Sequence, residues 1–319
     1  MSRTIAITGA TGFAGRQAAA ELLARGHKLK ALVRNPESAR LDPEVELVKG
    51  DISDSEALAR LVTGADAVVH LAGALAAADR QAYFAVNEAG TRALLGAAEK
   101  AGTERFVHIS SLAAREPQYS PYGASKRAGE EAVKAEMERR NAIVIRPPAV
   151  YGPGDKGTLP LIRELTKPVA AIPALKAARF SLIHVRDLAR LICDAAESGL
   201  RGLHEVSDGK AGGHDWDGLI AIASAEEGRR IRPFFLPKAL PLAVAFGAET
   251  LSRVTGKPGL VNRGKIAELY HTDWVSREGT LRLPDPIGFR EGFAETVKWY
   301  RKAGWLPETR RADRRPANS

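Results

Sequence analysis

The stretch Thr8-Gly-Ala-Thr-Gly-Phe-Ala-Gly15 (TGATGFAG) decides the fold of this chain. Its glycines, Gly9, Gly12 and Gly15, hold the spacing G-x-x-G-x-x-G, and they follow the short apolar segment Thr4–Thr8. A helical pattern begins just after the last glycine. A glycine-rich turn between a strand and a helix lets the backbone approach a pyrophosphate at the N-terminus of that helix. The stretch therefore predicts a dinucleotide site; the alternative is a tight turn whose glycines serve packing alone.

Beyond this turn, strand-like and helical patterns alternate along the first half of the chain. The expected strands are Thr4–Thr8, His27–Arg34, Val45–Asp51, Ala65–Gly73, Glu104–Ser111 and Asn141–Pro147. The expected helices are Arg16–Arg25, Ser55–Val62, Asn87–Ala101 and Ser120–Arg140, and a further strand and helix lie within Arg179–Gly199. Alternation of this kind predicts an α/β fold with a doubly wound parallel sheet, which the strand at Arg179 is expected to rejoin.

The pattern becomes less regular after Pro153. We expect an NAD(P)-binding domain over residues 1–200 and a smaller C-terminal substrate-binding lobe over residues 201–319, with residues 153–179 as a further candidate part of that lobe. A basic tail from about residue 308 is expected to be disordered. The apolar, helix-like segment Leu236–Leu251 is interpreted as a buried helix; a pocket for an apolar substrate and peripheral contact with a membrane are the alternatives.

The bulk composition describes an ordinary globular protein. The chain has 319 residues, 45% hydrophobic and 27% charged, with a net charge of +9. The charge is spread along the chain and aromatic residues make up 6%, so we expect no nucleic-acid binding. The single cysteine, Cys193, leaves no disulfide and no cysteine-based metal cluster, and we expect no metal site. The first ten residues run into a strand and no long apolar run follows, so we expect a cytoplasmic protein with no signal peptide and no transmembrane segment.

The end of the second strand bears on the choice of dinucleotide. An NAD site usually carries an acidic residue there, which binds the ribose 2′-hydroxyl. Here the sequence continues Val33-Arg34 with no carboxylate, and an arginine suits the 2′-phosphate of NADP. Arg16 is a second candidate cation. We therefore expect NADP(H), with NAD(H) as the alternative. Asp51, after the third strand, is expected to bind the adenine amino group or to cap a helix.

A second motif lies in SPYGASK, Ser120–Lys126. Tyr122 and Lys126 are four residues apart at the expected start of a helix, so they share a helical face. A nearby ammonium group favours the phenolate, which predicts a lowered tyrosine pKa and a candidate acid or base. The alternative is an amphipathic helix with a packing tyrosine and a surface lysine.

These motifs resemble the extended short-chain dehydrogenases/reductases, which include nucleotide-sugar epimerases and 3β-hydroxysteroid dehydrogenase-like enzymes. The matching stretches, in family order, are TGATGFAG, Gly50-Asp51, HLAG (His70–Gly73), N-x-x-G-T (Asn87–Thr91), RFVHISS, YGASK, RPPAVYGPGD and RFSLIHVRDLA. The resemblance covers residues 4–190 and is looser from Gly202 onward. It implies a Rossmann sheet, a small-molecule alcohol or carbonyl substrate, and a homodimer.

The resemblance also implies roles for individual residues. Tyr122 would exchange a proton with the substrate oxygen, Lys126 would lower the pKa of Tyr122 and bind the nicotinamide ribose, and Ser111 would hydrogen-bond the substrate oxygen, with Ser110 ranked second. The implied cofactor-binding residues are Gly9, Thr11, Gly12, Phe13, Ala14, Gly15, Arg34, Asp51, Ile52, Leu71, Ala72, Gly73, Asn87, Tyr122, Lys126 and Pro148. For Asn87 the alternative is a helix N-cap, and His184 and Cys193 are expected to be structural.

Two departures from the family pattern limit the reaction. Leu112-Ala113-Ala114 stand where sugar-nucleotide dehydratases carry Asp-Glu, and Ala149 stands where many sugar-nucleotide epimerases carry Asn. Arg146, Lys156 and Arg186 keep phosphate binding open. We favour an NADP-dependent oxidoreductase that interconverts a secondary alcohol and a ketone. The alternatives are a nucleotide-sugar epimerase with retained cofactor, and a non-enzymatic scaffold similar to the accessory members of respiratory complex I.

Overall fold

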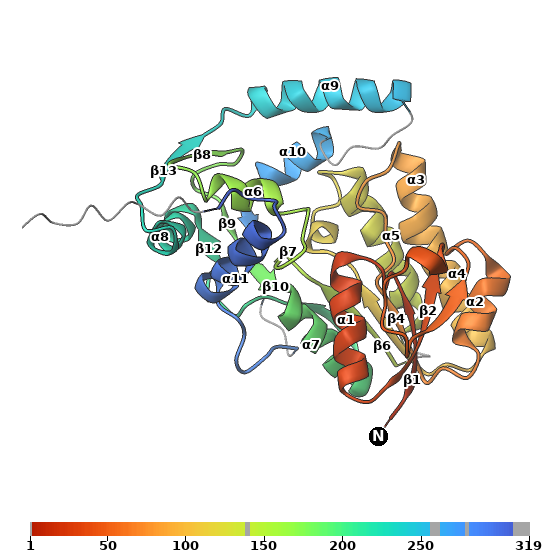
Figure 1. Cartoon of the computed structure of the whole chain (residues 1–319). Coiled ribbons are helices and arrows are strands. Elements are labelled where there is room, and N and C mark those ends of the chain that lie inside the picture. The colour runs from red at the N-terminus through yellow and green to blue at the C-terminus, as the bar shows by residue number, and fades with distance from the viewer. Residues whose placement is uncertain (1, 138–140, 256–261, 278–280, 309–319) are drawn as a thin grey trace, which may run out of the picture.

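The computed structural model describes residues 2–137, 141–255, 262–277 and 281–308, with no side-chain description over 250–255. A seven-stranded sheet forms its centre, in the order β11-β6-β5-β4-β1-β2-β3, and every pairing in it is parallel (Figure 1). Its strands are β1 (Thr4–Thr8), β2 (Lys28–Val33), β3 (Glu46–Lys49), β4 (Ala67–His70), β5 (Arg105–Ile109), β6 (Asn141–Arg146) and β11 (Gly202–Glu205). The predicted doubly wound α/β fold is confirmed.

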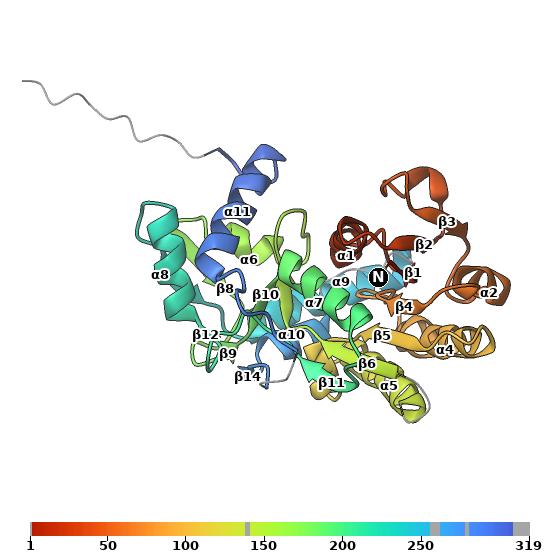
Figure 2. The ribbon, with the colours of Figure 1, turned by 90° about the horizontal axis from the view of Figure 1, so that it is seen from below.

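Helices cover both faces of this sheet, as Figure 2 shows from below. One face carries α1 (Phe13–Ala24) and α7 (Val185–Glu197); the other carries α2 (Ser55–Val62), α4 (Gly90–Lys100) and α5 (Pro121–Glu136). Successive strand residues point to opposite faces, so Ile5 and Ile7 join the first core and Ala6 joins the second. Both faces are buried, which explains the nearly continuous apolar strands.

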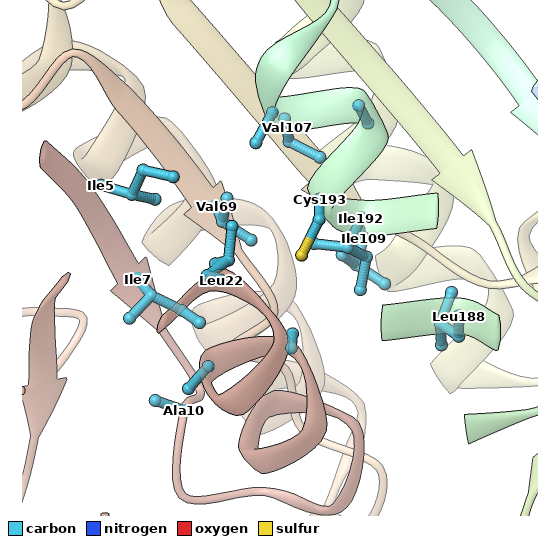
Figure 3. Close-up of a cluster of buried hydrophobic side chains, with 14 of the residues drawn as sticks. Ile5, Ile7, Ala10, Leu22, Val69, Val107, Ile109, Leu188, Ile192 and Cys193 are labelled. Atoms are coloured by element: carbon cyan, nitrogen blue, oxygen red, sulfur yellow. The ribbon is translucent and has the colours of Figure 1, made fainter. Parts of the chain in front are cut away.

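The core between the sheet and the α1–α7 layer is shown in Figure 3. Leu22 of α1 lies beside the strand residue Val69, Ile192 of α7 belongs to the same cluster, and all three side chains are fully buried. Each such aliphatic side chain contributes roughly 1.5–3 kcal/mol on burial. Cys193 lies in the same cluster, so it is a core residue as expected.

The segment that forms the seventh strand of the sheet is not the one predicted. The segment expected to rejoin the sheet forms β9 (Arg179–Phe180) and β10 (Leu182–His184), and β10 pairs with β7 (Ala149–Tyr151) outside the sheet. The edge of β6 is instead covered by β11, from beyond the predicted boundary at residue 200. Pro147 and Pro148 explain the difference, because prolines cannot donate ladder hydrogen bonds and therefore end β6 before β7 begins.

The helix predicted to start at Asn87 begins earlier. Asp79 caps α3 (Arg80–Phe84), accepting a hydrogen bond from the Ala82 amide at 2.8 Å. A π-helical turn over Ala85–Ala89 then joins α3 to α4. Asn87 is therefore not an N-cap: it lies inside the π turn and its side chain is buried. Turns of this kind are frequent at functional sites.

The C-terminal part of the chain adds small sheets and helices beside the main sheet (Figure 1). These are α6 (Leu159–Glu164), β8 (Val169–Ile172), β12 (His214–Asp215), α8 (Trp216–Glu226), β13 (Arg232–Phe235), α9 (Ala239–Thr255), α10 (Arg263–Leu269), β14 (Asp273–Trp274) and α11 (Phe289–Lys302). Trp216, Phe293 and Tyr300 lie in one separate core, which also holds Ile162 and Ile172. The division at residue 200 stays a prediction, and the basic tail falls on residues 309–319, outside the described residues.

The predicted helix over Leu236–Leu251 is present as α9, but its interpretation as a buried helix is wrong. Leu240 is 56% exposed and Phe246 is 62% exposed. The reason is that α9 packs along one narrow strip, where Ala245 contacts Ile266 and Tyr270 around α10. Across the ranges that the structure describes, we find no helix with both the length and the apolarity needed to cross a membrane.

Candidate active site

The glycine turn lies where the strand order reverses, between β1 and β4. Gly9 adopts a left-handed conformation, with φ of 75°, and its carbonyl accepts a hydrogen bond from the Gly12 amide at 3.0 Å. A Cβ atom on Gly15 would lie 2.0 Å from the Gly9 carbonyl oxygen. The turn therefore excludes a side chain at Gly15, and it is held tightly against the start of α1.

This turn fits the pyrophosphate of a dinucleotide. Gly12 occupies the N-cap of α1, and Thr11 and Gly12 are exposed, with Phe13 and Ala14 half-buried behind them. The first amides of a helix lack partners within the helix and carry its positive dipole end. An anionic group at this position would accept their hydrogen bonds. The backbone amides at the start of α1 can thus donate hydrogen bonds to the pyrophosphate of the predicted cofactor.

The ends of β1 and β4 are held together beside this turn. Thr8 Oγ1 is 2.7 Å from His70 Nδ1 and accepts a hydrogen bond from the Ala72 amide at 3.3 Å. His70 is fully buried, and burial lowers the pKa of its imidazole to about 3, so the ring is neutral. The loop Leu71–Gly73 consequently leaves the sheet next to the glycine turn, along the line that the cofactor is predicted to follow.

Arg34 and Asp51 follow the carboxyl ends of β2 and β3, and both are exposed. Arg16, at the start of α1, donates from Nε to the Thr11 carbonyl at 3.0 Å. Asp51 accepts hydrogen bonds from the Ser53 amide and hydroxyl at 3.2 and 3.1 Å. The interpretation of Asp51 as a helix cap is wrong, because Asp54 caps α2.

Ile52, the residue after Asp51, is buried and packs against Gly90 of α4. A Cβ atom added to Gly90 would lie 2.8 Å from the Ile52 side chain.

Asn87 joins the loop after β4 to α5. Its Oδ1 accepts from the Ala74 amide at 2.8 Å, and its Nδ2 donates to Ser125 Oγ at 2.8 Å. A Cβ on Gly73 would lie 3.0 Å from Asn87 Oδ1 and 3.6 Å from Lys126 Nζ. The structure therefore brings this loop, the π turn and the predicted catalytic lysine together at one edge of the sheet.

Ser111 and Tyr122 meet at the same edge. Ser111 follows β5 and caps a 3₁₀ turn, where its hydroxyl accepts from the Ala113 amide at 3.2 Å. Tyr122 lies in the first turn of α5, and its phenol lies near enough to the Ser111 side chain for that hydroxyl to lower the pKa of Tyr122. Ser110 points elsewhere: it is buried and donates to Glu130 Oε1 at 2.5 Å. Of the two serines, Ser111 is the one beside Tyr122.

Lys126 lies one helical turn beyond Tyr122 and is buried. Its Nζ donates to the Ile109 carbonyl, at the end of β5, at 2.7 Å. Burial lowers the pKa of Lys126 to about 8, although the nearby Glu130 carboxylate acts in the opposite direction. The ammonium group is thus directed at the sheet edge and the loop around Gly73.

The predicted lowering of the Tyr122 pKa is wrong in this structure. Loss of hydration raises the pKa of Tyr122 to about 12; the hydrogen bond with Ser111 lowers it, and the Glu268 carboxylate raises it further. Burial disfavours the phenolate, and here this effect exceeds any benefit from the cation one turn away. Tyr122 consequently keeps its proton at neutral pH.

The C-terminal lobe adds residues that the sequence motifs did not indicate. Glu268 of α10 is buried and accepts a short hydrogen bond from the Ser120 hydroxyl, which also caps α5. Lys265 Nζ lies 3.1 Å from the Glu268 carboxylate. The Tyr83 ring meets the Tyr122 ring edge-on, at a centroid distance of 6.3 Å. No local motif marks these residues, because each reaches the site through the tertiary fold.

Two of the arginines considered for phosphate binding are engaged in ion pairs. Arg146 is buried, with Nη2 at 2.6 Å from Glu130 Oε2 and Nη1 at 3.4 Å from Glu205 Oε1. Arg186 Nη2 lies 2.5 Å from Glu295 Oε2. Pro148 is buried behind the end of β6, and His184 caps α7 through the Arg186 amide. Arg146 is therefore a structural residue in this fold.

A parallel sheet with this strand order, and with a glycine turn at its switch point, defines the class of dinucleotide-binding α/β proteins. The model of the NAD dependent epimerase/dehydratase family matches residues 5–206. The chain belongs to this family, and the resemblance to extended short-chain dehydrogenases/reductases is confirmed.

Relatives extend the similarity over nearly the whole chain. The chain is 40% identical over 309 residues to the ceramide reductase of Caulobacter vibrioides, covering 95% of this chain and 96% of the relative. It is 30% identical over 237 residues to a 3 beta-hydroxysteroid dehydrogenase/Delta 5-->4-isomerase of Mycobacterium tuberculosis, covering 66% of this chain and 62% of that one. The family and these relatives identify the chain as an NAD-dependent enzyme of the oxidoreductase/epimerase type.

Solved structures agree on the fold. The Bordetella bronchiseptica enzyme WbmH in complex with NAD+ superposes with a TM-score of 0.69 at 21% identity, over 95% of this chain and all of that one. The UDP-glucose 4-epimerase of Thermus thermophilus superposes with a TM-score of 0.64 at 21% identity, over 94% and 99%. At this identity the likeness extends to the fold alone.

Proposed function

We propose that this protein is an NADP(H)-dependent reductase that converts a ketone on a ceramide-type lipid to the secondary alcohol. The observation that carries the proposal is the convergence of Tyr122, Ser111 and buried Lys126 at the edge of the sheet next to the glycine turn: the Ser111 hydroxyl influences the pKa of Tyr122, and Lys126 Nζ donates to the Ile109 carbonyl at 2.7 Å. Acid–base chemistry on a substrate oxygen needs a proton donor and a second hydrogen-bonding group within reach of the same atom. These three side chains provide that set.

In the proposed reaction, the substrate carbonyl oxygen lies between the Ser111 hydroxyl and the Tyr122 phenol. When bound, the reduced cofactor supplies a hydride to the carbonyl carbon. Tyr122 donates its proton to the carbonyl oxygen as the C=O π bond breaks, so the product is a neutral alcohol. The raised pKa of Tyr122 supports this direction, because the phenol holds its proton at neutral pH. Lys126 stabilises the negative charge that then develops on the phenol oxygen.

The preference for NADP(H) rests on charge at the end of β2. Arg34 follows that strand, Arg16 lies in the first turn of α1, and both residues are exposed. The 2′-phosphate of NADP carries negative charge and accepts hydrogen bonds, which arginine provides in pairs. NAD carries a hydroxyl at this position and gains little from these cations.

The substrate class follows from the relative rather than from the shape of a pocket. The 40% identity to a ceramide reductase spans 95% of the chain, including the C-terminal lobe that supplies Glu268 and α9. Leu112, Ala113 and Ala114 are buried apolar residues, which disfavours the acid–base step of a dehydratase at this position. Homodimerisation and a cytoplasmic location stay predictions.

The proposal is tested by following NADPH oxidation with a keto-ceramide in detergent micelles. Replacement of Tyr122 by Phe removes the proton donor while keeping the ring, so turnover should fall by at least ~100-fold. The matched control is Tyr119→Phe, because the Tyr119 ring contacts His271 and belongs to the same segment. Unchanged turnover in Tyr122→Phe would remove the phenol from the reaction.

Cofactor preference is tested separately through Arg34. Loss of its charge-assisted contacts in Arg34→Ala should lower kcat/KM for NADPH by roughly tenfold to a hundredfold and leave the value for NADH nearly unchanged. Lys28→Ala removes an exposed cation from the opposite end of β2 and should have no effect. An equal loss with both cofactors would contradict the assignment of Arg34 to the 2′-phosphate.

A further inference from the structure

The helix α9 presents large apolar side chains that are exposed. Every residue from Ala239 to Ala248 is apolar, and α9 packs on α10 through Ala245. The most exposed large side chains are Leu240 at 56%, Leu242 at 37%, Val244 at 65% and Phe246 at 62%. A surface helix of a globular protein normally turns a polar face to solvent, so this exposed apolar face indicates an interaction site.

Two further exposed apolar side chains lie on the strand pair formed by β8 and β13, the strand that precedes α9. Phe234 of β13 and Val169 of β8 are each 56% exposed. They share the outer face of the pair, because Arg232 pairs with Val169 and residues two apart on a strand point the same way. In Figure 1 this strand pair adjoins the start of α9. We call the residues Val169, Phe234, Leu240, Leu242, Val244 and Phe246 the apolar face.

The segment that leads into α9 carries only cations, although Arg229 pairs with the preceding Glu227 at 3.4 Å. Residues 229–248 contain Arg229, Arg230, Arg232 and Lys238 and no acidic residue. The first carboxylate, Glu249, pairs with Arg263 at 2.7 Å, and the Arg263 guanidinium also lies 6.0 Å from the centroid of the Phe246 ring. Exposed apolar side chains flanked by cations match an anionic lipid surface. They suit a second copy of this chain less well, because like charges would then meet.

The apolar face is also close to the reaction site. α9 rests on α10, and Glu268 of α10 is bound to Ser120 at the start of the helix that carries Tyr122. We propose that the apolar face docks on an anionic membrane surface and brings the active site to the headgroup region, where a lipid ketone resides. The docking itself rests on this surface alone, whereas the identity of the substrate rests on the proposed function.

Docking is tested by flotation of the full-length protein with vesicles, in the absence of substrate and cofactor. The probes are vesicles of phosphatidylcholine alone and of phosphatidylcholine mixed with phosphatidylglycerol. We expect binding to the mixed vesicles that weakens as salt screens the charges. Replacement of both Val244 and Phe246 by Ser should lower the partition coefficient by at least about tenfold. Leu47→Ser, on β3 at the far edge of the sheet, is the matched control.

The contribution of charge is measured with the double variant Arg232→Glu/Lys238→Glu. It should lose binding to the anionic vesicles by at least about thirtyfold, since each of the two basic residues near the surface contributes roughly 1 kcal/mol. Lys100→Glu, an exposed cation at the end of α4, should bind as the unmodified protein does. Equal loss in both charge variants would mean that net charge, rather than this face, attracts the protein.

Turnover separates this inference from the proposed function. The Val244→Ser/Phe246→Ser protein should lose activity on keto-ceramide in vesicles and keep it on a short-chain, water-soluble ketone analogue. A protein that binds vesicles but reduces no ketone would overturn the proposed function and leave docking intact. Absence of vesicle binding, or concentration-dependent dimerisation abolished by the same double variant, would overturn docking.

Discussion

Ser120 and Glu268 are 148 residues apart in the chain, yet the Ser120 hydroxyl donates a hydrogen bond to the Glu268 carboxylate. The contact is close because Gly264 of α10 lies against Ser120, where an added Cβ would come within 2.8 Å of the serine Cβ. Through this contact the C-terminal lobe brings a carboxylate to the start of α5. It thereby raises the pKa of the neighbouring Tyr122.

Replacement of Glu268 by Gln removes that charge and keeps an acceptor for Ser120. The pKa of Tyr122 should fall, because a carboxylate nearby disfavours the phenolate and a neutral amide does not. In the alcohol-oxidation direction Tyr122 must be deprotonated, so at a fixed pH near neutrality the variant should be faster, by roughly two- to tenfold. Glu46→Gln, an exposed carboxylate on β3, is the control. A slower variant would contradict the proposed electrostatic role.

Gly15→Ala should abolish the close approach of the turn to α1. The added Cβ would overlap the Gly9 carbonyl at 2.0 Å, so the turn must open and its amides lose their alignment. We expect NADPH affinity, measured by fluorescence titration, to fall by at least about tenfold. Gly96→Ala is the control, since no atom lies near its added Cβ and it sits within α4. It should bind NADPH normally and gain about 0.5–1 kcal/mol in stability. Normal affinity in Gly15→Ala would remove the turn from cofactor binding.

Lys126→Met should increase stability while removing activity. Burial lowers the folded-state pKa of Lys126 to about 8 from 10.5, so charging this group opposes folding at neutral pH by about 3 kcal/mol. Losing the hydrogen bond to Ile109 costs about 1 kcal/mol. The net gain in the free energy of unfolding at neutral pH, about 2 kcal/mol, should be measurable in urea.

The pH dependence provides the internal check on Lys126. The destabilising effect is fully present below the folded pKa of about 8, and it disappears as pH rises through 8 to 10.5, where the lysine is neutral in both states. The gain in Lys126→Met should therefore vanish at high pH. Lys134→Met, which changes a partly exposed lysine of the same helix that pairs with Glu131, should show neither effect. A loss of stability in Lys126→Met at neutral pH would contradict this account.

Arg146→Met should destabilise the fold without touching the reacting groups. Glu130 is fully buried, and Arg146 donates to both of its carboxylate oxygens, at 2.7 and 2.6 Å. Removing the cation leaves a buried carboxylate, at a cost of about 3–5 kcal/mol in the free energy of unfolding. The double variant Arg146→Met/Glu130→Gln should recover part of that loss.

The exposed pair Arg92–Glu88, with a separation of 3.3 Å, offers the comparison for that ion pair. Arg92→Met should cost no more than about 1 kcal/mol, because solvent screens exposed pairs. Thermal unfolding of the three variants measures the series. If Arg92→Met and Arg146→Met lower the free energy of unfolding by similar amounts, burial does not make the loss of the Arg146–Glu130 pair more destabilising.

Local patterns in the sequence determined the nucleotide-binding half of this protein. The spacing of Gly9, Gly12 and Gly15 and the alternation of apolar strands with helices predicted the parallel sheet and the glycine turn between its first strand and its first helix. Such patterns are informative because a left-handed glycine, a helix start or a buried strand restricts which residue types can occupy a few neighbouring positions. The shared helical face of Tyr122 and Lys126 followed from their spacing in the same way.

Only the tertiary structure decided the surroundings of those residues. The sequence already ranked Ser111 before Ser110, and the tertiary structure supplies the physical reason, because Ser110 is bound to Glu130 from α5. The tertiary structure reversed the expected direction of the Tyr122 pKa, since burial and Glu268 outweigh the spacing to Lys126. Burial and charge at one side chain depend on segments more than a hundred residues away, and no local pattern in the sequence records which of them will meet.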